Sequence, residues 1–349
     1  MNWFERLTGF TETDYHGTRA RLAVEGNELV SRVSGQRHRI GELELVPLGE
    51  LRRRAAAVTG VRGPLRLSFV SADVRALHQD PTYEGALFQV ASQFNLLEMV
   101  HERLTPEDGV SRYTTDRTQG PACAIAAGAA TVYRNYFVPV GDQLGQTRDR
   151  QLDALADLGA ALSREIGMPV SRMWSMRNGY ALCTADGLAA IEGYLLDADE
   201  ARRDRLRAHL RIGLHWRVEV TDAPGPRRPT VSQAFCSALP VAYGDAPAPR
   251  WAPFARLVLE AAYEATLLAG VLNAQGPGGC PVVALTRLGG GAFGNHGRWI
   301  DDAIRRAALL VADRALELRM VTMSAPSPAL RALERRLAAA DPRGADAHA

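Results

Sequence analysis

The chain has 349 residues, with 41 basic and 39 acidic side chains and a formal net charge of +2 at pH 7. A charge so nearly balanced gives no general case for binding to nucleic acid or to a membrane surface. The sequence contains no lysine, which excludes catalysis through a lysine Schiff base or a lysine general base. The length suits one large domain or two ordinary ones, with enough apolar residues for a sizeable core.

Metal sites, disulfides and targeting segments are not expected. The cysteines are scattered without a Cys-x-x-Cys pair, and no histidine or carboxylate cluster has the spacing of metal ligands. Residues 1–6 lack the basic and apolar regions of a signal peptide, and no run of about 18 apolar residues predicts a membrane span. We therefore expect a cytoplasmic protein that needs no metal or other cofactor and has no membrane partner.

Residues 1–63 are predicted to form a β-rich N-terminal extension, because short runs of alternating or β-branched residues are separated by glycine-containing turns. A helix is expected at residues 48–58, near the end of this extension. The predicted strands are residues 22–24, 29–33 and 43–45.

Polar residues follow two further strands, predicted at residues 65–70 and 85–91. Ligands of α/β sheets bind at the carboxyl ends of neighbouring strands, so these residues are candidates for a binding site. A single polar residue at such a position is usually an ordinary turn or cap residue. The prediction of a binding site depends on several of them lying together. The polar residues after the strands include Asp73 with the adjoining Val74, then Ser92, Gln93, Asn95 and Glu98.

The next segment is polar up to Gly120 and then becomes a helix of small residues, for which Pro121 suits the first turn. Asp116 and Gln119 lie in the polar part. Cys123 sits near the predicted helix start, where a thiolate would be favoured, so it is a candidate nucleophile. No histidine has a recognisable place as its base, and a small buried residue in a packed helix is the alternative role.

Residues 141–227 are predicted to carry helices at 152–166 and 186–214, followed by a strand at 215–220. A strand at 230–238 and a long helix at 251–273 come next. A last strand is expected at 316–323, a helix at 329–340, and a frayed tail to residue 349. Strands that alternate with helices predict a mostly parallel α/β sheet.

The most informative stretch is a short apolar run, Val282 to Leu285, followed by a loop rich in glycine and then by the helical pattern that begins at Trp299. Glycine lets backbone approach a ligand closely, and the N–H groups at a helix start favour an anion. This arrangement predicts a phosphate site, although a tight turn without a ligand is the alternative. The residues of the loop are Gly289, Gly290, Gly291, Ala292, Phe293, Gly294 and Asn295.

The succession of these motifs resembles the macrodomain family, which binds ADP-ribose, over residues 64–140 and 228–325. Ala72-Asp73-Val74 is similar to the Gly-Asp-Ile turn of the family, and Leu288 to Asn295 is similar to its phosphate loop, Gly-x-Gly-Val-Phe-Gly. Gly120 to Ile125 resembles its other glycine-rich loop. Gln89 and Ser92 stand where the family has the asparagines of Asn-Ala-Ala-Asn.

The resemblance implies a three-layer α/β/α macrodomain-like mixed sheet at residues 64–325, with a large insertion at about 141–227. The β-rich extension would precede this domain, and a C-terminal helix and tail would follow at 326–349. The chain would then be a divergent member of the family. It has no Gly-Gly-Gly followed by Gln-Glu-Glu, so it does not match the poly(ADP-ribose) glycohydrolase branch.

The resemblance also implies roles for the candidate residues. Asp73 would accept from the adenine amine, the amides of Gly290 to Gly294 would hold the diphosphate, and Phe293 would pack on the distal ribose. Gly120 and its neighbours would close the other side, with Gln89, Ser92, Gln93 and Asn95 facing the distal ribose. In an enzyme, Asn95, Glu98 and Asp116 would be the candidates to orient or deprotonate a water.

Three functions therefore remain open. The first is an ADP-ribosyl hydrolase that acts at the anomeric carbon of the distal ribose on ADP-ribose or an ADP-ribosylated substrate. The second is a non-catalytic module that binds ADP-ribose or another nucleotide. The third is an unrelated α/β hydrolase that uses Cys123.

Overall fold

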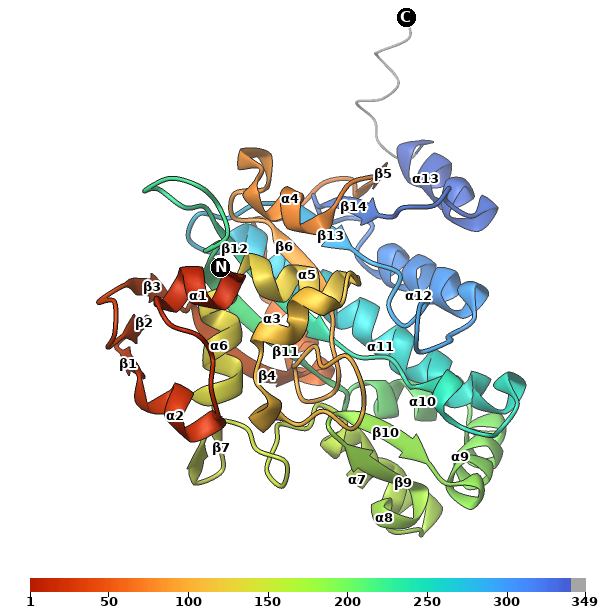
Figure 1. The fold of residues 1–349 in the computed structure, drawn as a ribbon. Coiled ribbons are helices and arrows are strands. Elements are labelled where there is room, and N and C mark those ends of the chain that lie inside the picture. Colours follow the sequence, from red (N-terminus) through yellow and green to blue (C-terminus); the bar gives the residue numbers. More distant parts are fainter. Residues whose placement is uncertain (340–349) are drawn as a thin grey trace, which may run out of the picture.

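A seven-stranded mixed sheet forms the centre of the computed structural model, which describes residues 1–339 (Figure 1). Its strands are β4 (Glu42–Pro47), β5 (Arg66–Val70), β6 (Leu87–Ala91), β11 (Arg211–Glu219), β12 (Thr230–Cys236), β13 (Val282–Leu285) and β14 (Glu317–Val321). They lie in the order β4-β11-β12-β6-β13-β14-β5. The strands from β12 to β5 in this order are parallel, and β11 is antiparallel to both β12 and β4.

Helices cover both faces of the sheet. Along β6, Leu87 belongs to the core on one face, whereas Phe88 and Val90 belong to the core on the other, as the alternation of a strand requires. The first face is covered by α3 (Leu48–Ala56), α11 (Ala248–Gln275) and α12 (Gly297–Leu310), and the second by α4 (Val74–Gln79), α5 (Gln119–Ala126) and α6 (Gly128–Tyr136). The predicted three-layer α/β/α fold with a mixed sheet is confirmed.

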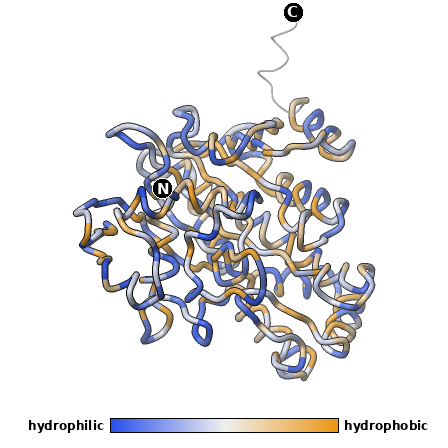
Figure 2. Tube along the Cα trace, in the orientation of Figure 1, coloured by the Kyte–Doolittle hydropathy of each residue, from blue (hydrophilic) through white to orange (hydrophobic). Residues whose placement is uncertain are grey.

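The central strand β13 has all four of its residues buried, in agreement with its continuous apolar sequence. Apolar residues gather along the inner strands and helices, while the outer loops are mostly hydrophilic (Figure 2). The carboxyl ends of β6, β12 and β13 therefore open onto loops that can carry polar groups without disturbing the core.

The N-terminal segment is less purely β than the sequence suggests. It begins with α1 (Trp3–Thr8) and α2 (Tyr15–Ala20), two short helices whose apolar residues pack against α5 and α6. A small antiparallel sheet follows, made of β1 (Leu22–Glu25), β2 (Glu28–Ser31) and β3 (Arg37–Arg39). The last strand of the segment, β4, pairs with β11 in the main sheet. The N-terminal segment is therefore continuous with that sheet.

The predicted insertion also supplies a strand to the main sheet, because β11 pairs with both β4 and β12. The helix expected at 186–214 is in fact two helices and the start of β11, since Asp199 caps a new helix after a break at Ala198. The division of the chain into domains stays a prediction. The remaining elements of this segment are β7 (Pro139–Val140), β8 (Gln143–Leu144), α7 (Ala156–Ile166), α8 (Val170–Met173), β9 (Trp174–Arg177), β10 (Tyr180–Cys183), α9 (Ala185–Asp197) and α10 (Glu200–Arg207).

The helix predicted near the C-terminus is present as α13 (Pro328–Ala339), and the predicted tail lies outside the described residues. Among residues 1–339, α11 is the one helix long and apolar enough to cross a membrane. The expectation of no such segment overlooked it because Arg256, Glu260 and Glu264 interrupt its apolar run. Most of α11 is buried in the core, as in many globular folds, so this is weak evidence for a span.

Candidate functional site

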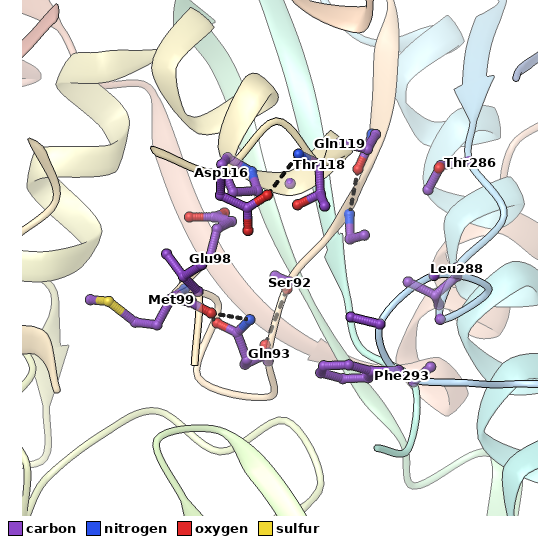
Figure 3. Close-up of a pocket in the computed structure, with 18 of the residues that line it drawn as sticks. Ser92, Gln93, Glu98, Met99, Asp116, Thr118, Gln119, Thr286, Leu288 and Phe293 are labelled. Atoms are coloured by element: carbon purple, nitrogen blue, oxygen red, sulfur yellow. Dashed lines mark hydrogen bonds between the residues drawn. The ribbon is translucent and has the colours of Figure 1, made fainter. Parts of the chain in front are cut away.

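A cavity of about 280 Å³ lies at the carboxyl ends of β6, β12 and β13. One wall is the turn after β6, with Ser92, Gln93 and Glu98, and the opposite wall is the loop after β13, with Leu288 and Phe293 (Figure 3). Asp116 lies on the same side as Glu98 in this view. Of the strand ends expected to carry a site, those of β6 and β13 border this cavity, whereas the end of β5 does not.

A second cavity, of about 730 Å³, adjoins the first at the ends of β5 and β14. Asp73 and Val74, which follow β5, and residues 321–323, at the end of β14, are among the residues that line it. The two cavities share four lining residues, so together they extend along the carboxyl edge of the sheet. The shared residues are Asp116, Gln119, Thr286 and Arg287.

The glycine loop is held in shape by its own backbone. The amides of Gly290, Gly294 and Asn295 donate to the carbonyls of Arg287, Gly291 and Gly289, at 3.0, 3.0 and 2.9 Å. Within residues 1–339, the amides of Gly291, Ala292 and Phe293 make no hydrogen bond to the protein. The prediction that Gly290 to Gly294 all offer their amides is thus corrected, because two of these groups are used inside the loop.

Helix α12 contributes less to this site than expected. It begins at Gly297, and the side chain of the capping residue His296 accepts from the amide of Arg298 at 3.2 Å. Asn295, just before the cap, ties the loop down by donating from Nδ2 to the carbonyl of Leu239 at 2.8 Å. An anion in the cavity would therefore meet loop amides and not the free first turn of a helix.

Two glycines of the loop differ in what they require. Gly289 has φ of +71°, and a Cβ at this position would lie 2.7 Å from Nδ2 of Asn295. Glycine is needed there, since L side chains avoid this backbone region and the space is filled. At Gly291, by contrast, a Cβ would meet nothing within 4 Å. The loop thus has a fixed base and an open tip.

Glu98 is the buried carboxyl of the site. Its side chain is inaccessible to solvent and borders the first cavity. Burial raises the pKa of Glu98 to about 7, while the guanidinium of Arg134 and the hydroxyl of Tyr113 oppose that rise. A carboxyl with such a pKa exists in both protonation states near neutral pH, which suits acid–base chemistry.

The other two acidic candidates are held locally and retain a free oxygen. Oδ1 of Asp116 accepts from the amide of Thr118 at 2.7 Å, and Oδ1 of Asp73 accepts from the amide of Arg75 at 2.8 Å as the cap of α4. Both are cap or turn residues, as acidic residues in loops often are. Each still faces a cavity and can accept another hydrogen bond.

Two residues predicted to contact the ligand lie elsewhere. Gln89 lies in the core, where its Nε2 donates to Thr266 at 3.0 Å and its Oε1 accepts from the amide of Thr286 at 3.3 Å. Asn95 is buried and bonded to Gln151 and Leu97. Neither borders the two cavities, since alternation in β6 turns Gln89 toward α11 and the local turn directs Asn95 away. We drop both from the site.

Gln119 lines both cavities but also fastens the start of α5 to β6. Its Oε1 accepts from the amide of Ala91 at 2.8 Å, and its Nε2 donates to the carbonyl of Gln89 at 2.7 Å. Gly120 follows it, and a Cβ there would collide with the carbonyl oxygen of Ala91. This close approach of helix and strand explains the small residues in the segment.

The cysteine hypothesis is not supported. Cys123 is completely buried, and burial raises the pKa of its thiol well above the usual value. Its sulfur contacts the amide of Gln119 at 3.2 Å, in place of the histidine base that a nucleophile needs. Cys123 is a small core residue between α5 and the sheet.

Several lining residues were not predicted. Arg287 borders both cavities and pairs with Asp301 on α12; its place directly before the glycine loop could have indicated it. Tyr180 and Tyr243 form an aromatic cluster with Phe293, with ring centroids 5.1 to 5.8 Å apart. Tyr180 comes from the central insertion, and nothing in the local sequence connects it with the glycine loop.

No family model matches the sequence, and no curated protein matches it. Solved structures with a similar fold include poly(ADP-ribose) glycohydrolase from Thermomonospora curvata, at 13% identity and a TM-score of 0.43 over 92% of this chain and 99% of that chain. The enzyme from Deinococcus radiodurans in complex with ADP-ribose is similar at 12% identity and a TM-score of 0.42, over 85% and 94%. TM-scores of this size describe a distant likeness of fold.

Proposed function

We propose that this protein binds ADP-ribose, or an ADP-ribosyl group on a larger molecule, along its two cavities and hydrolyses a bond at the anomeric carbon of the distal ribose. The observation that carries the proposal is the pairing, in one cavity, of unbonded backbone amides with a buried carboxyl whose pKa is about 7. The first group suits a phosphate and the second suits proton transfer.

The ligand is oriented by the chemistry of the two cavities. The adenosine half occupies the larger cavity, where the free oxygen of Asp73 accepts from the adenine amine. The amides of Gly291, Ala292 and Phe293 donate to the diphosphate, and the ring of Phe293 packs on the distal ribose. The resemblance of the sequence to macrodomains implies the same ligand and the same direction.

The reaction is a displacement by water. The bond from the anomeric carbon to the attached group breaks, the leaving atom takes up a proton, and a water oxygen forms the new bond and gives up a proton. Glu98 is placed to exchange one of these protons, and its partly protonated state at neutral pH allows either direction. Asp116 is the second carboxylate on this wall and can orient the water.

Calorimetry with free ADP-ribose tests binding, with AMP and ribose 5-phosphate as partial ligands. We expect ADP-ribose to bind more tightly than either fragment, because only it fills both cavities. In Gly291→Glu the new carboxylate points into open space, so the fold should remain while the like charge weakens binding by about 100-fold or more. Gly291→Ala is the matched control and should bind nearly as the wild type does.

Turnover is then measured as release of free ADP-ribose from poly(ADP-ribose) and from a mono-ADP-ribosylated protein. Binding without release from either substrate would establish the non-catalytic module in place of the hydrolase. Absence of heat with ADP-ribose, AMP and ribose 5-phosphate would contradict both and leave the glycine loop as a structural turn.

A further inference from the structure

Behind Glu98 lies an arginine that the proposed reaction does not yet use. Arg134, on α6, is fully buried, and its Nη2 donates to both carboxylate oxygens of Glu98, at 3.2 and 3.4 Å. The same nitrogen contacts Oγ1 of Thr131 at 3.1 Å, and the guanidinium lies 3.9 Å from the ring centre of Phe235. Every side of the guanidinium is therefore in contact with protein.

A pair of this kind is not explained by stability alone. In many buried ion pairs, the free energy needed to remove two charges from water exceeds the free energy of their attraction. Replacing such a pair by apolar residues of similar volume therefore often leaves the stability of the folded protein unchanged. Such a pair is better explained by its effect on the position and the ionisation of the carboxyl. Here Glu98 borders the cavity, whereas Arg134 is buried and is not among the residues that line it.

The backbone next to Glu98 gives independent support. Leu96 has φ of +63°, a region that a bulky side chain rarely adopts, and residues in such conformations cluster at functional sites. Nε of Arg134 donates to the carbonyl of this strained residue at 3.0 Å. One arginine thus holds both the turn that precedes Glu98 and the carboxylate itself.

The other end of the turn is also fixed. The side-chain amide of Gln93 accepts from the amide of Met99 at 2.8 Å and donates to its carbonyl at 3.1 Å. Residues on both sides of Glu98 are therefore held by side-chain hydrogen bonds, which fix the backbone from which its side chain extends. Figure 3 shows Gln93 and Met99 joined below Glu98 on the same wall.

We propose that Arg134 is a positioning residue, which fixes the turn at residues 93–99 and holds the Glu98 carboxylate against the cavity by two separate contacts. This inference rests on the proposed function for its catalytic meaning, but the two contacts are properties of the free protein.

The groups that face Glu98 define its electrostatic surroundings. They are Arg134 from α6, the hydroxyl of Tyr113 from the 3₁₀ helix at Ser111–Thr115, Cys123 from α5, and Asp116 in the same cavity. Behind Arg134 lies His215, whose pKa burial and the nearby guanidinium hold well below its usual value, so it stays neutral. Burial raises the pKa of Glu98, and Arg134 is the cation among these groups that opposes this rise.

The test is a pH titration of the Glu98 carboxyl in protein with isotope-labelled glutamate, followed by NMR and assigned by the signal that Glu98→Gln removes. In Arg134→Met the midpoint should move upward by about 1 to 3 pH units, because the opposing charge is gone. Arg134→Lys keeps the charge and should leave the midpoint closer to that of the wild type. Arg53→Met, which breaks an exposed pair with Glu50 on α3, is the control and should leave it unchanged.

Two further measurements distinguish a positioning role of Arg134 from a purely structural one. The pH–rate profile for ADP-ribose release should move upward with the titration in Arg134→Met, and kcat should fall by about 100-fold while KM changes little. If Arg134→Met does not fold, Arg134→Gln, whose amide can still donate to the Leu96 carbonyl, must show the same upward shift. An unchanged midpoint in a folded variant overturns the proposal. Absence of turnover in the wild type would contradict the hydrolase function, yet the titration would still decide the role of Arg134.

Discussion

The two loops that face each other across the cavity are built in different ways. The loop at residues 289–295 is shaped by glycines and by hydrogen bonds between its own backbone groups. The turn at residues 93–99 contains no glycine, although Leu96 adopts a conformation that glycine would prefer. Side chains hold it instead, Gln93 from within and Arg134 from a helix 36 to 38 residues further along the chain.

This difference matches what each loop presents to a ligand. Backbone amides need only a suitable path of the chain, which glycines provide locally. A carboxyl with a perturbed pKa needs burial and a counter-charge, and these come from residues distant in sequence. The glycine loop is therefore suited to binding, and the turn is suited to chemistry. Changes in the two loops should affect affinity and rate separately.

The largest expected effect comes from removing the ionisable group of the turn. Glu98→Gln keeps the size of the side chain and leaves an oxygen that can accept from Arg134, so the fold should persist. We expect release of ADP-ribose to slow by about 100- to 10,000-fold, the range for loss of a general acid or base. The affinity for ADP-ribose, measured by calorimetry, should change little, since the glycine loop is untouched.

Asp116→Asn is the comparison variant for this prediction. Asp116 borders the same cavity, but its carboxyl is partly exposed and already accepts from Thr118. If Asp116→Asn abolishes turnover while Glu98→Gln retains it, the proton-transfer role belongs to Asp116, and the assignment of Glu98 is wrong.

The fold could be predicted to a large extent because its signals are local. The apolar run at β13, the helical spacing in α11 and α12, and the alternation at β5 each follow from neighbouring residues. The pairing of β4 with β11 could not be predicted in this way, since it joins segments about 170 residues apart. Strand partners depend on packing of the whole chain, so these two strands were assigned to an extension and an insertion.

In the site, too, the features with a local sequence signal could be predicted, and those that depend on distant segments could not. Glycines identified the loop at 289–295, and polar residues after strands identified Asp73, Ser92 and Glu98. The pairing of Arg134 with Glu98 could not be predicted from the sequence, because it depends on how α6 packs against the sheet. Gln89 was misplaced for a related reason, since which face of β6 meets the cavity is settled by the helices on either side.

A second prediction uses the pH dependence of stability to test the turn without a ligand. The pKa of Glu98 is raised in the folded state, from 4.5 to about 7, so the folded protein holds this proton more tightly than the unfolded chain. Its stabilising contribution is complete below about pH 4.5 and is lost as the pH rises through 7. Between pH 5 and 8 the free energy of unfolding should fall by roughly 2 to 3 kcal/mol from this group.

Chemical denaturation of the wild type and of Glu98→Gln at both pH values measures this effect as a difference between the two proteins. Other titrating groups, such as the buried His78, are present in both and cancel. The variant should lack the decrease. An equal decrease in both proteins would show that Glu98 ionises as freely as an exposed glutamate, contrary to the closed surroundings described for the turn.

The smallest expected effect separates the base of the glycine loop from its tip. Gly289→Ala introduces a Cβ at φ of +71°, against Ala238 and the Asn295 amide, so it should lower the free energy of unfolding by about 1 to 3 kcal/mol. Gly291→Ala meets open space and should change it by less than about 0.5 kcal/mol. Denaturant unfolding of both variants measures the contrast. Similar losses would mean that the loop is uniformly constrained; a clear difference would show that its shape is set at Gly289 and that its tip is left free to meet a ligand.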